Sequence, residues 1–178
     1  MKIQGSEKLH HPAPLVFSTL RDKMDALVKL IPNIEQVEVL ERRDEPPRVH
    51  LHNRWQGSGS DIPGALRPFI KKELTGWNDR AVWDESTLTC TWEIESIIGR
   101  NVFSCHGATQ IVPNGENEST FTIDGELNVN PDKVPGVPGF LARKLQGPLE
   151  NFIATLIRPN LTSTATAVER YLSERKQS

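Results

Sequence analysis

Asn53 and Asp79 are the residues best placed for chemistry, because each falls on the inward face of a strand whose other inward residues are apolar. A carboxylate buried beside tryptophans has its pKa raised by desolvation, which would suit it to acid–base work. The alternative, which we favour, is that Asp79 lies near an open end of the sheet or pairs with Arg54 or Arg80. Asn53 could orient a ligand carbonyl or hydroxyl group, or it could satisfy backbone groups at a bulge.

Histidine and cysteine side chains offer weaker signals. His50 and His52 are two residues apart on one strand face, a spacing that can hold a metal ion. Zinc needs three or four suitable ligands, no third accompanies this pair, and the face is predicted to be exposed, so we expect no metal site. Cys90 and Cys105 face inward by alternation, could be neighbours if their strands pair, and should behave as small hydrophobic residues.

Motifs for other chemistry are missing from the sequence. It contains no serine–histidine–carboxylate spacing, no phosphate-binding loop and no dinucleotide-binding fingerprint. We therefore assign no catalytic residue and expect no cofactor.

Length and charge limit the class of protein. The chain has 178 residues, of which 37% are hydrophobic, and this length fits one domain, residues 1–178. Its 21 basic and 23 acidic residues give a formal net charge of −2, which predicts no nucleic-acid partner. No apolar run approaches the roughly 20 residues of a membrane-spanning helix, the N-terminus lacks a secretory signal, and two cysteines are too few for a disulfide framework. We expect a soluble cytoplasmic protein that does not insert into membranes, and the oligomeric state stays open.

Apolar periodicity predicts the elements that would position the candidate residues. A brief strand at 2–9 precedes a helical stretch that begins after Pro12 and ends at Pro32, divided at Asp22-Lys23 into two short helices. The period then changes to two, which is typical of half-buried strands. The predicted further strands are 34–42, 49–55, 77–83, 88–94, 101–109 and 121–129.

The C-terminal third has a helical period. From Pro148 to Arg175, apolar residues recur three or four apart, and Gly147-Pro148 and Pro159 predict a kink or two separate helices.

Two connecting segments combine glycine and proline with apolar residues, at 61–74 and 131–139. Each would be either a gate over a binding site or a cap on one end of the core.

Three stretches and the order of elements resemble a known superfamily. The stretches are LVKLIPNIEQVEVLE, TGWNDRAVWDESTLTCTWEIES and PGFLARKLQGPLENFIATLI. They resemble the START-like (SRPBCC) helix-grip superfamily, which includes pollen-allergen-type proteins, polyketide cyclases and lipid-transport domains. The resemblance implies an α+β helix-grip fold, in which a curved antiparallel sheet of about seven strands wraps around a long C-terminal helix, with two short helices after the first strand. The glycine-rich segment follows the third strand here, rather than the second as in the allergen-type members.

The resemblance also implies an apolar cavity between the sheet and the last helix. Aromatic residues on one face of the predicted sheet agree with a cavity of a few hundred cubic ångströms, although they could instead simply pack against the helix. We predict that the protein binds or transports a hydrophobic small molecule, lipid or polyketide-like. The alternatives are a polyketide cyclase/dehydratase-like enzyme with Asp79 as its acid–base group, and a protein-interaction module that uses the exposed end of the long helix. The predicted ligand contacts are Asn53, Trp55, Trp77, Asp79, Trp83, Trp92, Phe103, Phe121, Phe152 and Leu156.

Overall fold

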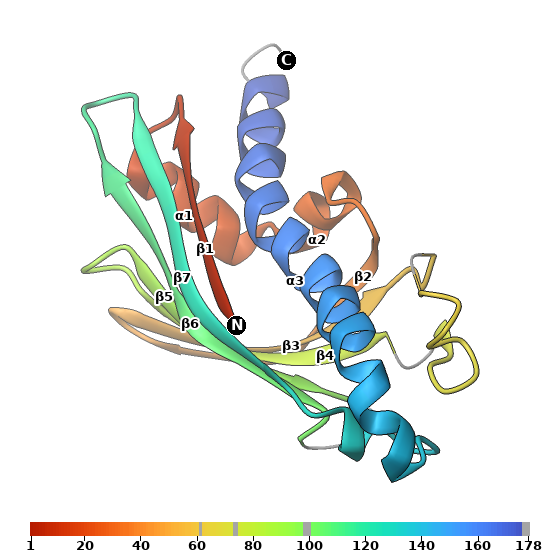
Figure 1. The fold of residues 1–178 in the computed structure, drawn as a ribbon. Helices are drawn as coiled ribbons and strands as arrows, with labels where there is room; N and C mark the ends of the chain where they lie inside the picture. Colours follow the sequence, from red (N-terminus) through yellow and green to blue (C-terminus); the bar gives the residue numbers. More distant parts are fainter. Residues whose placement is uncertain (61, 73–74, 98–100, 176–178) are drawn as a thin grey trace.

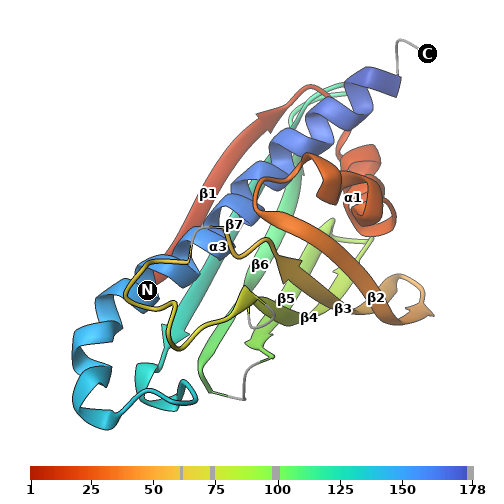
Figure 2. The same ribbon diagram turned by 90° about the vertical axis from the view of Figure 1, so that its right-hand side faces the viewer.

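A strongly curved antiparallel sheet holds one long helix against its concave face (Figure 1). The computed structural model describes residues 1–60, 62–72, 75–97 and 101–175, and for 155–162 it describes the backbone without the side chains. Figure 2 shows the long helix running between the first strand on one side and the second strand on the other. The two edge strands of the sheet therefore lie on either side of the helix.

The element order matches the sequence prediction. The helices are α1 (Ala13–Asp22), α2 (Met24–Leu27), η1 (Val28–Leu30), η3 (Pro131–Lys133) and α3 (Gly139–Arg175). The strands are β1 (Lys2–Leu9), β2 (Ile34–Glu45), β3 (Arg48–Gly57), β4 (Gly76–Asp84), β5 (Thr89–Ser96), β6 (Phe103–Pro113) and β7 (Ser119–Val129). The seven strands and the pair of short helices, divided between Asp22 and Met24, are confirmed.

The sheet has the order β1-β7-β6-β5-β4-β3-β2, and every neighbouring pair is antiparallel. Strands β2 to β7 follow one another as a meander, and β1 pairs with β7 at the far edge. Alternation of buried and exposed residues along β3, β5 and β7 gives the sheet one apolar face, which is the face that α3 covers. This register decides which side chains meet beneath the helix.

Helix α3 continues through the residues expected to divide it. It runs as one element from Gly139 to Arg175, so the prediction of two separate helices is wrong. A proline inside a helix removes one backbone hydrogen bond, but the burial of neighbouring side chains offsets that loss. Leu145, Leu149 and Phe152 are all buried around Pro148 and fasten this part of the helix to the sheet.

The segment between β3 and β4 is ordered by its apolar residues. Ile62, Leu66 and Ile70 are buried, and backbone bonds from Leu66 to Pro63 and from Ile70 to Leu66 close helical turns. These side chains cap one end of the core, as one of the two alternatives for this segment expected. Residues 61, 73 and 74 of the predicted segment lie outside the described residues.

A pair of facing glycines makes room for Trp92, one of the tryptophans of the concave face. Gly107 of β6 lies opposite Gly125 of β7, and the Trp92 indole packs directly on both. A Cβ atom on Gly125 would lie 2.5 Å from Cη2 of Trp92, and one on Gly107 would collide with the backbone of Asp124. The indole is held in place by its Nε1 atom, which donates a hydrogen bond to Thr109 Oγ1 at 3.2 Å.

We expect Gly125→Ala to lower the free energy of unfolding by about 1–3 kcal/mol, because the added methyl group overpacks the Trp92 contact. Gly64→Ala is the matched control, since a Cβ atom there meets nothing within 4 Å. Urea denaturation of both variants measures the difference. The cost of Gly125→Ala should shrink in a Trp92→Leu background, and equal stability of the two alanine variants would show that the glycine pair does not matter.

Candidate functional site

A cavity lies on the concave side of the sheet, where strands β3 to β7 approach α2 and α3. Its volume is ≈ 90 Å³. This is smaller than the few hundred cubic ångströms predicted from the sequence, because the large aromatic side chains fill much of the space beneath the sheet. The described residues that line it are Leu20, Met24, Trp55, Trp77, Asp79, Ala81, Trp83, Cys90, Trp92, Ile94, Thr109, Phe121 and Thr164.

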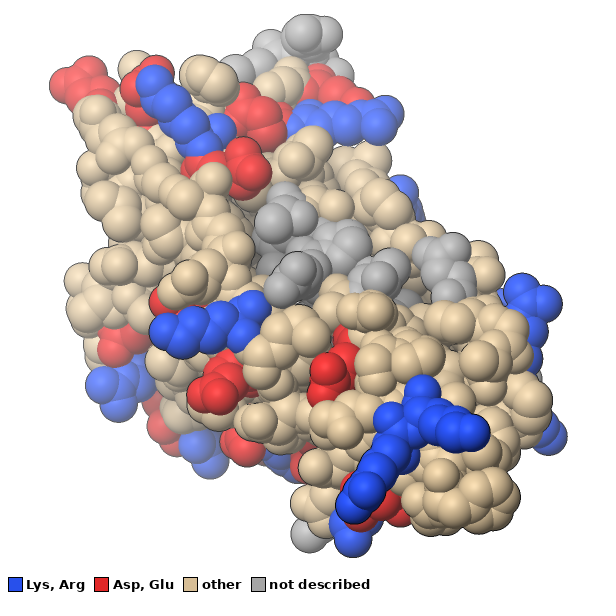
Figure 3. All heavy atoms as spheres, viewed as in Figure 1, with Lys and Arg blue, Asp and Glu red and all other residues tan. Residues whose placement is uncertain are grey.

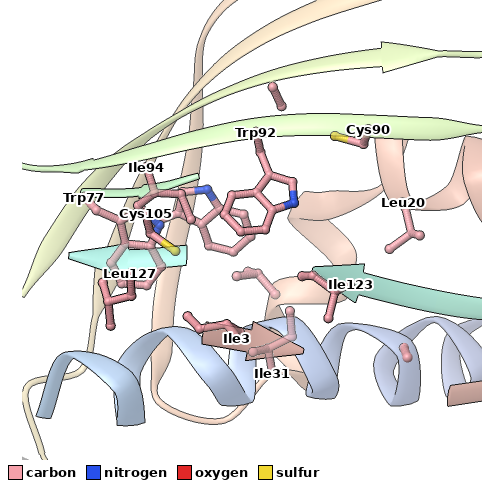
Figure 4. Close-up of a cluster of buried hydrophobic side chains, with 14 of the residues drawn as sticks. Ile3, Leu20, Ile31, Trp77, Cys90, Trp92, Ile94, Cys105, Ile123 and Leu127 are labelled. Atoms are coloured by element: carbon pink, nitrogen blue, oxygen red, sulfur yellow. The ribbon is translucent and has the colours of Figure 1, made fainter. Parts of the chain in front are cut away.

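Four tryptophans are among the residues that line the cavity. The rings of Trp55 and Trp77 are stacked, with centroids 5.9 Å apart and planes inclined by 8°. Trp83 meets Phe17 of α1 edge to face at 5.3 Å, which fixes its ring against the helix pair. Figure 4 shows Trp92 projecting from β5 into the space above α3, with Cys90 on the same strand and Trp77 to the other side. The rings therefore form rigid walls rather than a loose interior.

Asp79 is the acidic residue in the described part of this wall, and strand register places it there. Asn53 of β3 lies directly opposite Asp79 of β4, and Trp55 lies opposite Trp77 two residues along. Asn53 Nδ2 donates to Asp79 Oδ2 at 3.1 Å, and Trp55 Nε1 donates to the same oxygen at 3.4 Å. Among the described residues Asp79 has no salt bridge, so the expected pairing with Arg54 or Arg80 is wrong. Those arginines lie on the strands' other face, because side chains alternate along a strand.

Burial raises the pKa of the Asp79 carboxyl group to about 6, although the hydrogen bonds from Asn53 and Trp55 oppose that shift. The ionised form loses its water shell among apolar rings, and two neutral donors restore only part of that solvation. The carboxyl group therefore changes charge near neutral pH. Burial, together with the nearby Asp79, also raises the pKa of the Cys90 thiol well above its usual range, so the thiol stays neutral.

Most of the ligand contacts predicted from the sequence line this cavity. They are Trp55, Trp77, Asp79, Trp83, Trp92 and Phe121. Asn53 is buried behind Asp79 and holds it. Phe103 and Phe152 are buried in the core outside the lining, and Phe103 lies opposite Val129 at the far end of β6. Leu156 lies outside the described side chains.

Sequence reasoning missed seven of the described lining residues, which are Leu20, Met24, Ala81, Cys90, Ile94, Thr109 and Thr164. Leu20 and Met24 come from the short helices, whose approach to the sheet no local pattern reveals. Ala81 and Cys90 share a strand face with the tryptophans, and that alternation was a usable signal. Cys90 and Cys105 are both buried and free but are not paired across the strands, since the register sets Cys105 opposite Ile94.

Other kinds of site find little support in the described part of the chain. It contains no cluster of three histidine, cysteine or acidic side chains that could hold a metal ion. None of its helices is both long and apolar enough to cross a membrane. Positive and negative side chains are interspersed with uncharged surface on the face shown in Figure 3. The tryptophan-lined cavity is therefore the candidate site that we develop further.

Comparison with known proteins adds information about the fold. No protein-family model matches the sequence, and no curated protein matches it. The Zhui aromatase/cyclase from Streptomyces sp. R1128 is 17% identical, with a TM-score of 0.66 over 97% of this chain and 95% of that one. Norcoclaurine synthase from Thalictrum flavum is 14% identical, with a TM-score of 0.61 over 98% and 87%. Ara h 8.0201 is 14% identical, with a TM-score of 0.55 over 98% of each chain.

These three proteins belong to the START-like superfamily, so the resemblance stated from the sequence is confirmed as a resemblance of fold. The chain has the helix-grip architecture along nearly its whole length. Identities of this size say nothing about which molecule the cavity holds, because that depends on side chains.

The raised pKa of Asp79 predicts that the free energy of unfolding falls as rising pH ionises this carboxyl group. Asp79→Asn should remove that loss of stability. The folded value is about 6 and the ordinary value 3.8, so between them the folded protein binds more protons than the unfolded chain. Stability contributed by Asp79 is therefore complete below the unfolded pKa and is lost as pH rises through the folded one.

We expect the stability of Asp79→Asn, relative to the wild type, to be higher at about pH 8 than at about pH 4, by on the order of 2 kcal/mol. Chemical denaturation across this range measures the difference. Parallel pH profiles for the two proteins would contradict the assignment, whatever constant offset the substitution produces.

Proposed function

We propose that the protein binds, and carries or sequesters, a small hydrophobic molecule, lipid or polyketide-like, in the cavity between the sheet and α3. The observation that carries this proposal is a cavity whose described lining holds four tryptophans and a single carboxyl group. Cavities of this kind, mostly apolar with a few polar groups that fix orientation, are the usual form of small-molecule sites.

Two further features support binding. The rings are held by contacts that do not involve a ligand, namely the Trp55–Trp77 stack, the Trp83 contact with Phe17 and the Trp92 hydrogen bond. A site organised before the ligand arrives loses less entropy on binding. In addition, a fold neighbour, the Zhui protein, is an aromatase/cyclase, which is in keeping with a polyketide-like ligand here.

A second candidate function is acid–base catalysis on such a ligand, and the pKa of Asp79 near 6 favours it. Against it, the described lining offers no second side chain that could exchange protons near neutral pH, since Cys90 stays neutral. We therefore place binding first.

Asp79→Asn separates catalysis from binding when a neutral polyketide-like substrate is used. If Asp79 is the acid–base group, turnover should fall by roughly a hundredfold or more while substrate affinity stays within a few-fold. Steady-state kinetics with equilibrium binding on the same variant gives both quantities. Turnover by the variant at the wild-type rate would exclude Asp79 from catalysis.

Filling the cavity should block binding without unfolding the protein. Ala81 is buried in the lining between the tryptophans, so Ala81→Leu should weaken binding of a fluorescent apolar probe by roughly tenfold or more. Ala108→Leu is the control, because Ala108 is on the opposite face of the sheet and is half-buried.

Native mass spectrometry and organic extraction of the purified wild-type protein identify any molecule that copurifies. An empty protein that binds no apolar probe, or equal probe affinity in both leucine variants, would overturn the proposed function. The tryptophans would then simply fill the core.

A further inference from the structure

The carboxyl group of Asp79 is incompletely satisfied. Both of its donors, Asn53 and Trp55, reach the same oxygen, Oδ2, and none of the described residues donates to Oδ1. No described cationic side chain pairs with it, although it lies in the wall of an apolar cavity. A buried carboxylate without a counterion costs several kcal/mol in proteins generally, so a cation supplied by a ligand would relieve a cost already present.

The surrounding rings favour positive charge. The N–H of Trp55 is taken by Asp79 and that of Trp92 by Thr109, so these two rings have no free donor for a ligand oxygen. The N–H of Trp83 has no partner but is itself buried out of a ligand's reach. The Trp55, Trp83 and Trp92 rings therefore present mainly π-electron and carbon surface to the cavity, and tryptophan is the side chain that attracts cations most strongly through its ring.

From this juxtaposition, and resting on the proposed function, we propose that the ligand is an organic cation whose ammonium group lies between Asp79 and the tryptophan rings. The cavity volume of ≈ 90 Å³ suits a small head group. A carboxylate beside tryptophans supplies both attractions that an alkylated ammonium ion needs, a counterion and aromatic surfaces. A ligand that presents only a carbonyl oxygen would use neither.

A matched pair of probes tests the charge alone. Choline and 3,3-dimethylbutan-1-ol have the same shape, with a quaternary nitrogen in the first where the second has a carbon atom. We expect the wild-type protein to bind choline at least about tenfold more tightly than the alcohol. Asp79→Asn should abolish this preference and leave the affinity for the alcohol within a few-fold. Asp124→Asn should keep the preference, because Asp124 is exposed on the outer face of β7, where it accepts a hydrogen bond from Gln4.

Saturation-transfer NMR and tryptophan fluorescence give both affinities, and circular dichroism confirms that each variant is folded. The choline preference should also fall as pH drops from about 7 to about 5, since choline itself does not titrate. The pKa of Asp79 is about 6, and the other ionisable side chain in the described lining, Cys90, stays neutral.

The outcomes separate this inference from the function on which it rests. Equal affinity for the two probes, or a choline preference that survives Asp79→Asn, would overturn the organic cation while apolar-probe binding upheld the cavity. Failure of choline, the alcohol and the fluorescent apolar probe alike would overturn the proposed function itself.

Discussion

The rest of this structure depends on one constraint: a single long helix must cover the apolar face of the sheet. A seven-stranded sheet that presents tryptophans on its concave side must remove that side from water, and the main cover available to it is α3. The need for this cover explains why the helix continues past Pro148 and why the sheet bends around it. Beneath the helix, the facing glycines Gly107 and Gly125 admit the Trp92 indole, which a Cβ atom at either position would obstruct. One helix does not fill the concave side of the curved sheet completely, and the cavity that is left is the candidate site.

Within that cavity the buried carboxyl group of Asp79 lowers the stability of the fold when it is ionised. Asp79 lies among aromatic rings with two neutral donors and no described cationic partner, and burial moves its pKa toward neutrality. An apolar residue at this position would serve the core better. Local costs of this kind concentrate at functional sites, where they are offset by the rest of the fold. Here the offset comes from the long sheet ladders and from the buried face of α3.

The solved structures that share this fold differ from the chain at most positions, with identities of 14% to 17% for the three compared. In this chain the helix-grip architecture sets where the cavity forms, between the sheet and the helices that cover it. What the cavity accepts depends on the few side chains that reach it. Among the described lining residues, four are tryptophans and one carries a carboxyl group, and this combination, more than the fold, characterises the site.

The sequence by itself determined the order and kind of the elements and much of the concave face. Period-two alternation identified the strands, prolines and the Asp22-Lys23 step bounded the short helices, and inward alternation placed Asp79 beside tryptophans. Only the tertiary structure decided which strand residues face each other and how closely the helices approach. Those distances depend on side-chain volumes summed over the whole core. For that reason the sequence overestimated the cavity volume, offered an arginine as one possible partner of Asp79, allowed two separate helices in place of α3 and left Met24 out of the site. Local patterns record which face a side chain takes, whereas its partners and the space around it are set by residues far away in the chain.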